Sequence, residues 1–236
     1  MSVKENATTI AENVPKVYEA GKKSEYDRFW DAYQENGTRK NYAYAFAGQA
    51  WASESLNPKY PIRFNDSNAN TRHACGMFCW HGRGRTDYVL DVSTLDIDWS
   101  GCKSLYLTFA NAKVDNITID GSNIISMNNT FSGADGGNTI TTINLKVTET
   151  CTDFSNAFHY CTKLTNLTFT DDSVIAEHIS LAQSSLLSAE SVNSIINALE
   201  DRSGLTARTV TFHTDIVANL TETQLQQISE KNWQVG

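Results

Sequence analysis

The densest group of chemically reactive side chains lies in the nine-residue stretch HACGMFCWH, where His73 and His81 bracket Cys75 and Cys79. All four are side chains of the kinds that bind zinc, and structural zinc sites pair cysteines at gaps of two to four residues. The gap of three residues between Cys75 and Cys79 fits that rule. Residues two apart on a strand share a face, so alternation does not separate the four side chains. They form a candidate metal site.

A second interpretation places the same stretch in a hydrophobic core. Phe78 aligns with Phe131 and Phe158, which lie in later segments of similar sequence. On this alignment Cys75 and Cys79 lie beside core positions, where a free cysteine is a common small hydrophobic residue. We favour this interpretation, so the sequence predicts no metal and no cofactor. The four-residue zinc site stays open as the alternative.

Side chains suited to acid–base or nucleophilic catalysis are scattered along the chain. Ser, His and Asp occur without a nucleophile elbow. The Gly-rich sequence GADGG lacks the Lys and Ser/Thr of a phosphate-binding loop. The sequence therefore predicts no catalytic residues and a protein that is not an enzyme.

The charge balance of the 236-residue chain is acidic, with 27 Asp and Glu against 19 Lys and Arg. Proteins that grip phosphate backbones need a basic surface, so we expect no nucleic-acid partner. No stretch approaches the roughly 18 apolar residues of a membrane span, and the N-terminus lacks the apolar region of a secretory signal, so we expect no membrane partner. The five cysteines are an odd number without a scaffold pattern, which predicts reduced, buried thiols.

A repeated pattern occupies the chain from about residue 73 onward. Apolar–polar–apolar trios begin at Ile117, Ile143 and Leu167, which are 26 and 24 residues apart, and a phenylalanine precedes each trio. A repeat of 20–29 residues with an L-x-L strand core is typical of leucine-rich repeats. The pattern predicts an α/β fold, a leucine-rich-repeat solenoid of short parallel strands. The preceding phenylalanines are Phe109, Phe131 and Phe158.

Stacking such units assigns a side to each residue of a trio. One unit cannot bury its apolar side alone, so the first residues of the trios are expected to form one internal ladder and the third residues another. The central residues then face the opposite way, because side chains alternate along a strand. Further trios begin at Leu95, Ile179 and Val210. The central residues predict a polar binding surface for a glycan or a protein. They are Asp96, Thr118, Asn144, Thr168, Ser180 and Thr211.

The first 36 residues predict a helical segment. Val3, Ile10, Val14 and Val17 belong to a series of small or apolar residues spaced alternately by four and three, as in a coiled coil. A proline directly after Val14 predicts a break or kink there. Two interpretations stay open: one amphipathic helix packed on its own domain, and a short oligomerising stalk that gives a homo-oligomer such as a trimer.

The C-terminal end predicts a cap of helices and strands over the open end of the solenoid. Ser188 is a candidate N-cap for one helix, and Thr221 with Gln224 forms a capping box for a second. Trp233 and Val235 then suit a closing strand. The predicted regions are an N-terminal helical or oligomerisation segment (1–36), an aromatic-rich connector (37–72) and a leucine-rich-repeat domain with its cap (73–236).

The segments NTFSGADGGNTITTINL and DFSNAFHYCTKLTNLTF resemble the BspA-like leucine-rich repeats of bacterial and phage proteins. The segments SAESVNSIINALED and LTETQLQQISEKNWQV resemble the usual finish of that group. The segment AENVPKVYEAGKKSEYDRFWDAYQENGTRKNYAYAFAG resembles the part that precedes such repeats in proteins of Firmicutes phages and prophages. The resemblance covers nearly the whole chain and implies no catalytic residues.

This resemblance implies a non-enzymatic interaction module of the phage particle, associated with the virion or its tail. The N-terminal helix is expected to contact other virion proteins, and the repeats are expected to bind a host-surface glycan or protein during attachment. A bacterial surface or secreted adhesin, located outside the cell, is the alternative. A zinc-binding protein centred on the stretch HACGMFCWH is a further alternative.

Overall fold

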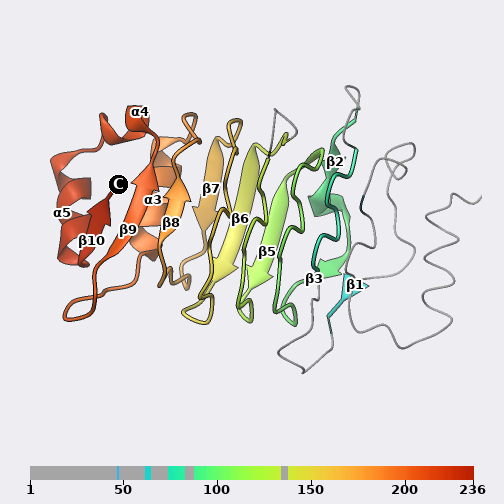
Figure 1. Cartoon of the computed structure of the whole chain (residues 1–236), viewed down its shortest axis with the longest axis horizontal. Helices are drawn as coiled ribbons and strands as arrows, with labels where there is room; N and C mark the ends of the chain where they lie inside the picture. Colours follow the sequence, from blue (N-terminus) through green and yellow to red (C-terminus); the bar gives the residue numbers. More distant parts are fainter. Residues whose placement is uncertain (1–46, 48–61, 65–73, 83–87, 134–137) are drawn as a thin grey trace, which may run out of the picture. The chain divides into compact units, whose positions relative to one another are not determined.

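The structure is a computed structural model that describes residues 47, 62–64, 74–82, 88–133 and 138–236. The described part is a mixed α/β structure of short parallel strands in small sheets, with few helices (Figure 1). None of the described helices is long and apolar enough to cross a membrane. The predicted helical segment 1–36 lies outside the described residues, and so do Val3, Ile10, Val14 and Val17.

The central sheet consists of β5 (Ile117–Gly121), β6 (Thr142–Val147) and β7 (Asn166–Phe169), which pair in parallel in that order. Ile117 pairs with Ile143, and Ile143 pairs with Leu167. Two residues further along each strand lies a second buried ladder, again in register. Both predicted ladders are confirmed, because the alternation that buries one apolar residue also buries the next but one. The second ladder is Ile119, Leu145 and Phe169.

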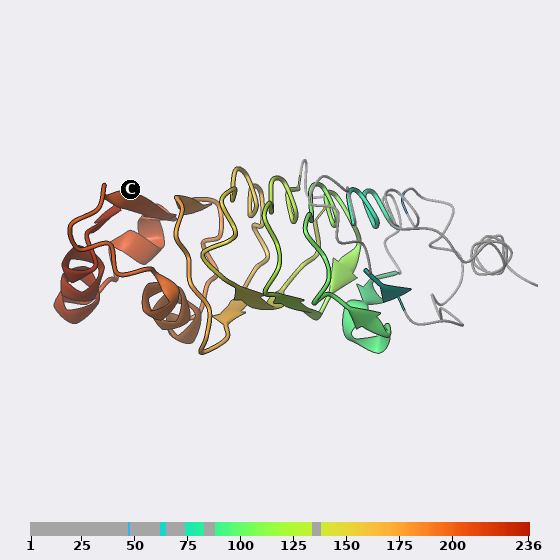
Figure 2. The same cartoon turned by 90° about the horizontal axis from the view of Figure 1, so that it is seen from below.

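Four turn-rich stretches lie opposite the central sheet and are called the return segments. They cover residues 74–81, 104–111, 126–133 and 153–160. Neighbouring return segments join through backbone hydrogen bonds, such as Phe109 N–H to Thr130 O at 2.8 Å and Phe131 N–H to Ala157 O at 2.9 Å. The return segments therefore form their own parallel ladder, separate from the sheet (Figure 2).

A continuous stack of phenylalanines fills the space beneath the return segments. The ring centroids of successive phenylalanines lie 5.4, 5.7 and 5.4 Å apart, and all four side chains are buried. Stacked rings combine a large buried apolar area with a favourable geometry. The stack confirms the predicted alignment, including the placement of the first phenylalanine in a core position. Its members are Phe78, Phe109, Phe131 and Phe158.

Left-handed backbone positions shape the return segments. One is occupied by Gly76, Leu107, Asn129 and Asn156, with φ between 54° and 61°. A residue with positive φ turns the chain sharply, and asparagine tolerates this conformation better than most residues other than glycine. The turn brings the phenylalanine two residues later into the stack.

Helix α3 (Ala189–Ala198) covers the free edge of β7. The Ser191 hydroxyl oxygen accepts a hydrogen bond from Leu167 N–H at 2.9 Å, and the Ser194 hydroxyl oxygen accepts one from Phe169 N–H at 2.8 Å. These hydroxyls satisfy strand donors that would otherwise lack a partner. The next strand of the chain therefore cannot extend the central sheet at this edge.

The C-terminal sheet consists of β8 (Ile179–Leu181), β9 (Arg208–Phe212) and β10 (Trp233–Val235), all parallel. The helices after β9 are α4 (Thr214–Val217) and α5 (Glu222–Glu230). The predicted N-cap of α3, the capping box of α5 and the closing strand are all present. In Figure 2 this sheet lies on the side of the return segments, away from the central sheet.

The predicted trio that begins at Leu95 does not form a strand like the others. Asp91 accepts a hydrogen bond from Ser93 N–H and caps the 3₁₀ helix η2 (Val92–Thr94), after which Leu95 ends the turn. The hydrogen bond of this cap favours a turn at Val92–Thr94 over an extended strand conformation. Only the end of the trio enters a strand. The strands here are β1 (Ile62–Arg63), paired with β3 (Ile97–Asp98), and β2 (Leu90–Asp91), paired with β4 (Val114–Asp115).

Candidate functional site

The polar row predicted from the trios is divided between two sheets. Thr118, Asn144 and Thr168 are adjacent in the central sheet, and Asn144 Nδ2 lies 3.4 Å from the Thr118 hydroxyl. Ser180 and Thr211 are adjacent in the C-terminal sheet. Asp96 is exposed and precedes β3. The six residues therefore do not form one continuous surface, because α3 ends the central sheet at β7.

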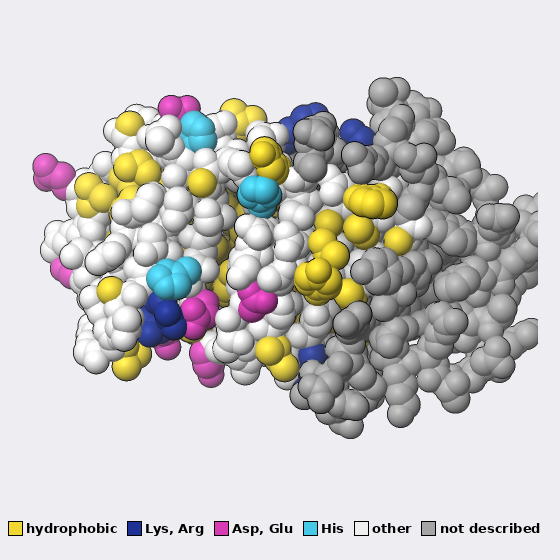
Figure 3. Space-filling view, viewed as in Figure 1, with side chains coloured by type: hydrophobic (Ala, Val, Ile, Leu, Met, Phe, Trp, Pro, Cys, Tyr) yellow, Lys and Arg dark blue, Asp and Glu magenta, His cyan; other side chains and the backbone are white. Residues whose placement is uncertain are grey.

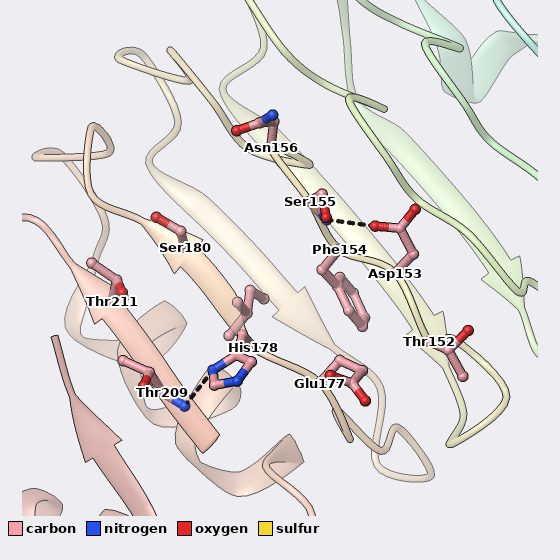
Figure 4. A pocket seen from close by; sticks show the side chains of 11 residues that line it. Thr152, Asp153, Phe154, Ser155, Asn156, Glu177, His178, Ser180, Thr209 and Thr211 are labelled. Carbon is pink, nitrogen blue, oxygen red and sulfur yellow. Dashed lines mark hydrogen bonds between the residues drawn. The ribbon is translucent and has the colours of Figure 1, made fainter. Parts of the chain in front are cut away.

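Ser180 and Thr211 line a hollow on the side of the return segments (Figure 4). The hollow has a volume of about 330 Å³, and its other walls are residues 152–156 and 177–179 with Thr209. The fourth return segment and the C-terminal sheet thus meet at one depression. Two of the six predicted binding residues lie in it, together with residues that the trio pattern does not select.

A second hollow of about 440 Å³ lies further toward the N-terminal repeats. Asp153 lines both hollows, so they lie side by side on this face. We call the two hollows together the polar groove. The remaining residues that line the second hollow are Cys75, Ser104, Tyr106, Ser126 and Asn128.

A repeated local turn places the side chains of the polar groove. Ser104, Ser126 and Asp153 form a row of parallel bridges across the return segments. The side chain of each accepts a hydrogen bond from the backbone N–H two residues later, at 3.4, 3.3 and 3.0 Å in chain order. Such turns fix a short polar side chain against its own backbone. The groove floor is therefore ordered by the same repeat that builds the core.

Asp153 is the best-anchored carboxylate of the groove. Its Oδ1 accepts from Ser155 N–H at 3.0 Å, and its Oδ2 accepts from the Ser126 hydroxyl at 3.0 Å. Partial burial raises the pKa of Asp153, but hydrogen bonds from Ser155, Ser126 and Asn128 outweigh that effect, so the pKa lies below its ordinary value. The carboxylate is therefore ionised at neutral pH and can only accept hydrogen bonds.

A second charged group lies at the C-terminal end of the groove. Glu177 forms an ion pair with Arg208 at 2.6 Å, and Arg208 Nη1 lies 3.4 Å from His178 Nε2. His178 Nδ1 accepts a hydrogen bond from Thr209 N–H at 2.9 Å, as Figure 4 shows. These contacts hold the imidazole ring at the wall of the groove, and Arg208 balances the charge of Glu177.

The four candidate zinc ligands are only partly placed. His73 lies outside the described residues. Cys75 and His81 are buried, and His81 Nε2 lies 3.0 Å from the Tyr88 hydroxyl. Within the part of the chain that the structure describes, no group of three or more His, Cys, Asp or Glu side chains could hold a metal ion.

The five cysteines are all unpaired thiols, and four of them are buried. Burial raises the pKa of Cys79 to about 11 and the pKa values of Cys102 and Cys151 to about 12. Burial also raises the pKa of Cys161. Thiols with raised pKa are poor nucleophiles, because the thiolate is the reactive form. The predicted burial is confirmed for Cys75, Cys102, Cys151 and Cys161, whereas Cys79 is half-buried.

The trio pattern missed most of the polar groove, although a signal for it is present in the sequence. Each phenylalanine from Phe109 onward is preceded five positions earlier by Ser104, Ser126 or Asp153. The residues three positions before the same phenylalanines are Tyr106, Asn128 and Ser155. Counting back from the phenylalanines, instead of searching within the strands, would have found both rows.

The chemical capacity of the groove is hydrogen bonding by hydroxyl, amide and carboxylate groups on a fixed backbone, with one tyrosine ring at its N-terminal end. Figure 3 shows a face on which uncharged polar groups predominate and charged side chains are few. Comparison of the chain with family models, curated proteins and solved structures finds no match.

Proposed function

We propose that this chain is a non-enzymatic leucine-rich-repeat solenoid that binds a host-surface glycan or protein. The stacked phenylalanines and the two in-register ladders of the central sheet support the solenoid. Repeats that stack in this way present extended rigid surfaces, which solenoid proteins commonly use for binding. The sequence resemblance to phage proteins supports a location on the virion or tail and a role in host attachment.

The observation that carries the binding function is the polar groove. Its side chains are held by turns that repeat from one return segment to the next. Such ordering lowers the entropy lost when a ligand binds, because the contacting groups are already in place. The row Thr118, Asn144 and Thr168 on the central sheet also offers hydrogen bonds, but it lines neither hollow of the groove.

Binding of the full chain to bacterial envelopes tests this function. A fluorescent fusion of residues 1–236 is incubated with envelope fractions from a panel of Firmicutes and Gram-negative bacteria. Saturable binding to a subset of envelopes is expected, and Ser180→Arg in the groove is expected to remove it. Thr168→Arg on β7 is the matched control. Absence of saturable binding across the panel, or equal binding by Ser180→Arg, would overturn the proposal.

The proposed role of the N-terminal segment has a separate test. We propose that this segment joins copies of the chain and contacts other virion proteins. Light scattering of the full chain is expected to give a multiple of the monomer mass, such as a trimer. Ile10→Asp is expected to lower it to the monomer mass, because a charge in a coiled-coil core position disfavours association. A parent chain that is already monomeric would exclude the stalk.

A further inference from the structure

We propose that the polar groove binds an extended, uncharged glycan that runs from Tyr106 to Thr211. This inference rests on the proposed binding function and names the ligand class. Polyanions such as nucleic acids or phosphate-rich wall polymers are excluded as ligands of the groove. Four observations carry the inference: the length of the groove, an exposed ring, the donors and acceptors along the floor, and the charge.

The length of the groove suits an oligomer. The two hollows, of about 440 and 330 Å³, meet at Asp153 and cross backbone segments from Tyr106 to Thr211. Those backbone segments are the second, third and fourth return segments, β8 and β9. A single small molecule would contact one hollow, whereas a chain of sugar units can contact both at once.

Tyr106 supplies an aromatic surface at one end. Its side chain is 40% exposed and lines the same hollow as Ser126 and Asn128. A tyrosine ring combines an apolar body with a polar tip, so it can pack against the apolar face of a sugar ring and hydrogen-bond at its edge. An exposed ring beside amide and hydroxyl groups matches a ligand with apolar faces and polar edges.

The floor of the groove supplies groups that both donate and accept hydrogen bonds. Asn128, Ser155, Ser180 and Thr211 are half-buried or exposed, and all line the groove. Hydroxyl and amide side chains donate and accept, as sugar hydroxyls do. These side chains lie on successive backbone segments, so a glycan lying across them meets one polar group on each segment.

The charge of the groove decides between neutral and anionic polymers. The carboxylate of Glu177 is balanced by Arg208, at 2.6 Å. The residues that donate hydrogen bonds to Asp153 are Ser155, Ser126 and Asn128, and all three are neutral. Asp153 therefore keeps its negative charge at the centre of the groove, where it accepts hydrogen bonds from hydroxyls and repels a polyanion.

An array of purified oligosaccharides tests the ligand class with the full chain. The neutral probes are gluco-, galacto- and N-acetylglucosamine oligomers graded in length, and the anionic probe is oligogalacturonate. We expect at least one neutral series to bind with affinity that rises with length, and oligogalacturonate not to bind. Ser180→Arg is expected to weaken neutral binding by at least about tenfold, and Thr168→Arg by less than about twofold.

Two variants at Asp153 sharpen the test of charge. Asp153→Asn keeps the shape and is expected to weaken neutral binding by about tenfold, because a carboxylate is the stronger acceptor. Asp153→Lys is expected to lose neutral binding and to gain binding of oligogalacturonate. Circular dichroism and the urea midpoint of each variant show whether it is folded, and only folded variants are compared.

The outcomes separate this inference from the proposed function. If no neutral oligomer binds, or if Ser180→Arg and Asp153→Asn bind as tightly as the parent, the inference is overturned. Envelopes treated with periodate or with protease give the second readout. Binding that survives periodate but not protease overturns the glycan and leaves the binding function standing with a protein ligand. Absence of binding to all untreated envelopes overturns the binding function itself.

Discussion

The central sheet and the face of the return segments are built from the same repeated stretches of chain, yet they present different surfaces. On the sheet, Thr118, Asn144 and Thr168 lie in register on neighbouring parallel strands. On the return segments, left-handed turns at positions such as Asn129 and Asn156 bend the backbone and leave hollows between polar side chains. Strict alternation thus places polar side chains in a row along the sheet, and the repeated turns place polar side chains around hollows.

The two faces also end differently toward the C-terminus. The sheet ends where the α3 hydroxyls of Ser191 and Ser194 pair with the edge of β7. The ladder of the return segments ends where Gln183 Oε1 accepts from Tyr160 N–H at 2.7 Å, and β8 follows on the same side. Only the side of the return segments continues into a second sheet, and this continuation forms the long groove.

The largest expected effect on stability comes from removing the Phe131 ring, which lies in the middle of the phenylalanine stack. Phe131→Ala is expected to lower the free energy of unfolding by about 3–5 kcal/mol, because it opens a cavity in the middle of the stack. Urea denaturation followed by tryptophan fluorescence measures it. The control is Leu186→Ala, whose side chain is 56% exposed and whose loss should cost less than about 0.5 kcal/mol. Equal costs for the two variants would contradict the stack as the shared core.

The end of the central sheet is tested by Ser191→Ala. The variant leaves Leu167 N–H buried without its acceptor, which is expected to cost about 1–3 kcal/mol of unfolding free energy. Asn197→Ala on the exposed side of the same helix is the control and should cost nothing measurable. Hydrogen exchange of the β7 amides is expected to accelerate in the first variant alone. Unchanged exchange at Leu167 would show that α3 does not seal this edge.

The turns of the return segments are tested by Asn156→Val. At φ 54° a β-branched residue is strained, and the expected cost is about 1–2 kcal/mol. Ser155→Val changes the neighbouring exposed residue, which lacks a positive φ, and serves as the matched control. Urea midpoints of the two variants make the comparison. A larger loss for Ser155→Val would mean that the turn is not what shapes this face.

A smaller effect is expected from pH. The pKa of Asp153 is lowered in the folded state, so the carboxylate stabilises the fold above its unfolded pKa, and this contribution is lost as the pH falls below about 4. The stability difference between the parent and Asp153→Asn should therefore be constant from pH 8 to 5 and shrink at pH 3. Urea midpoints at these values measure it. A difference that grows on acidification would have the wrong sign.

No effect is expected from metal removal. Cys75 and His81 are buried, and His81 contacts Tyr88, so these side chains are engaged in packing rather than held open for a metal ion. Purified protein should contain less than one equivalent of zinc, and its melting temperature should not change with a chelator, whereas structural zinc sites lose stability on metal removal. A stoichiometric zinc content would contradict this prediction and support the alternative of a zinc site that includes His73.

The sequence by itself determined the periodic core. The trios determine which residues of β5, β6 and β7 face inward, because side chains alternate along any strand. The similarity of its segment to later segments aligns Phe78 with the later phenylalanines. The caps of the last two helices were also predictable, because capping depends on a few neighbouring residues. These features are local, or they repeat a local pattern.

Only the tertiary structure decided which polar residues share a surface. Ser180 and Thr168 look equivalent in sequence, since each is the central residue of a trio, but α3 occupies the edge that β8 would need in order to join the central sheet. Similarly, Asp153 and Thr211 meet at one groove although 58 residues separate them (211 − 153). Alternation predicts which way a side chain points within its strand. Which strands become neighbours depends on which strand edges are still free to pair, and α3 already covers the edge of β7.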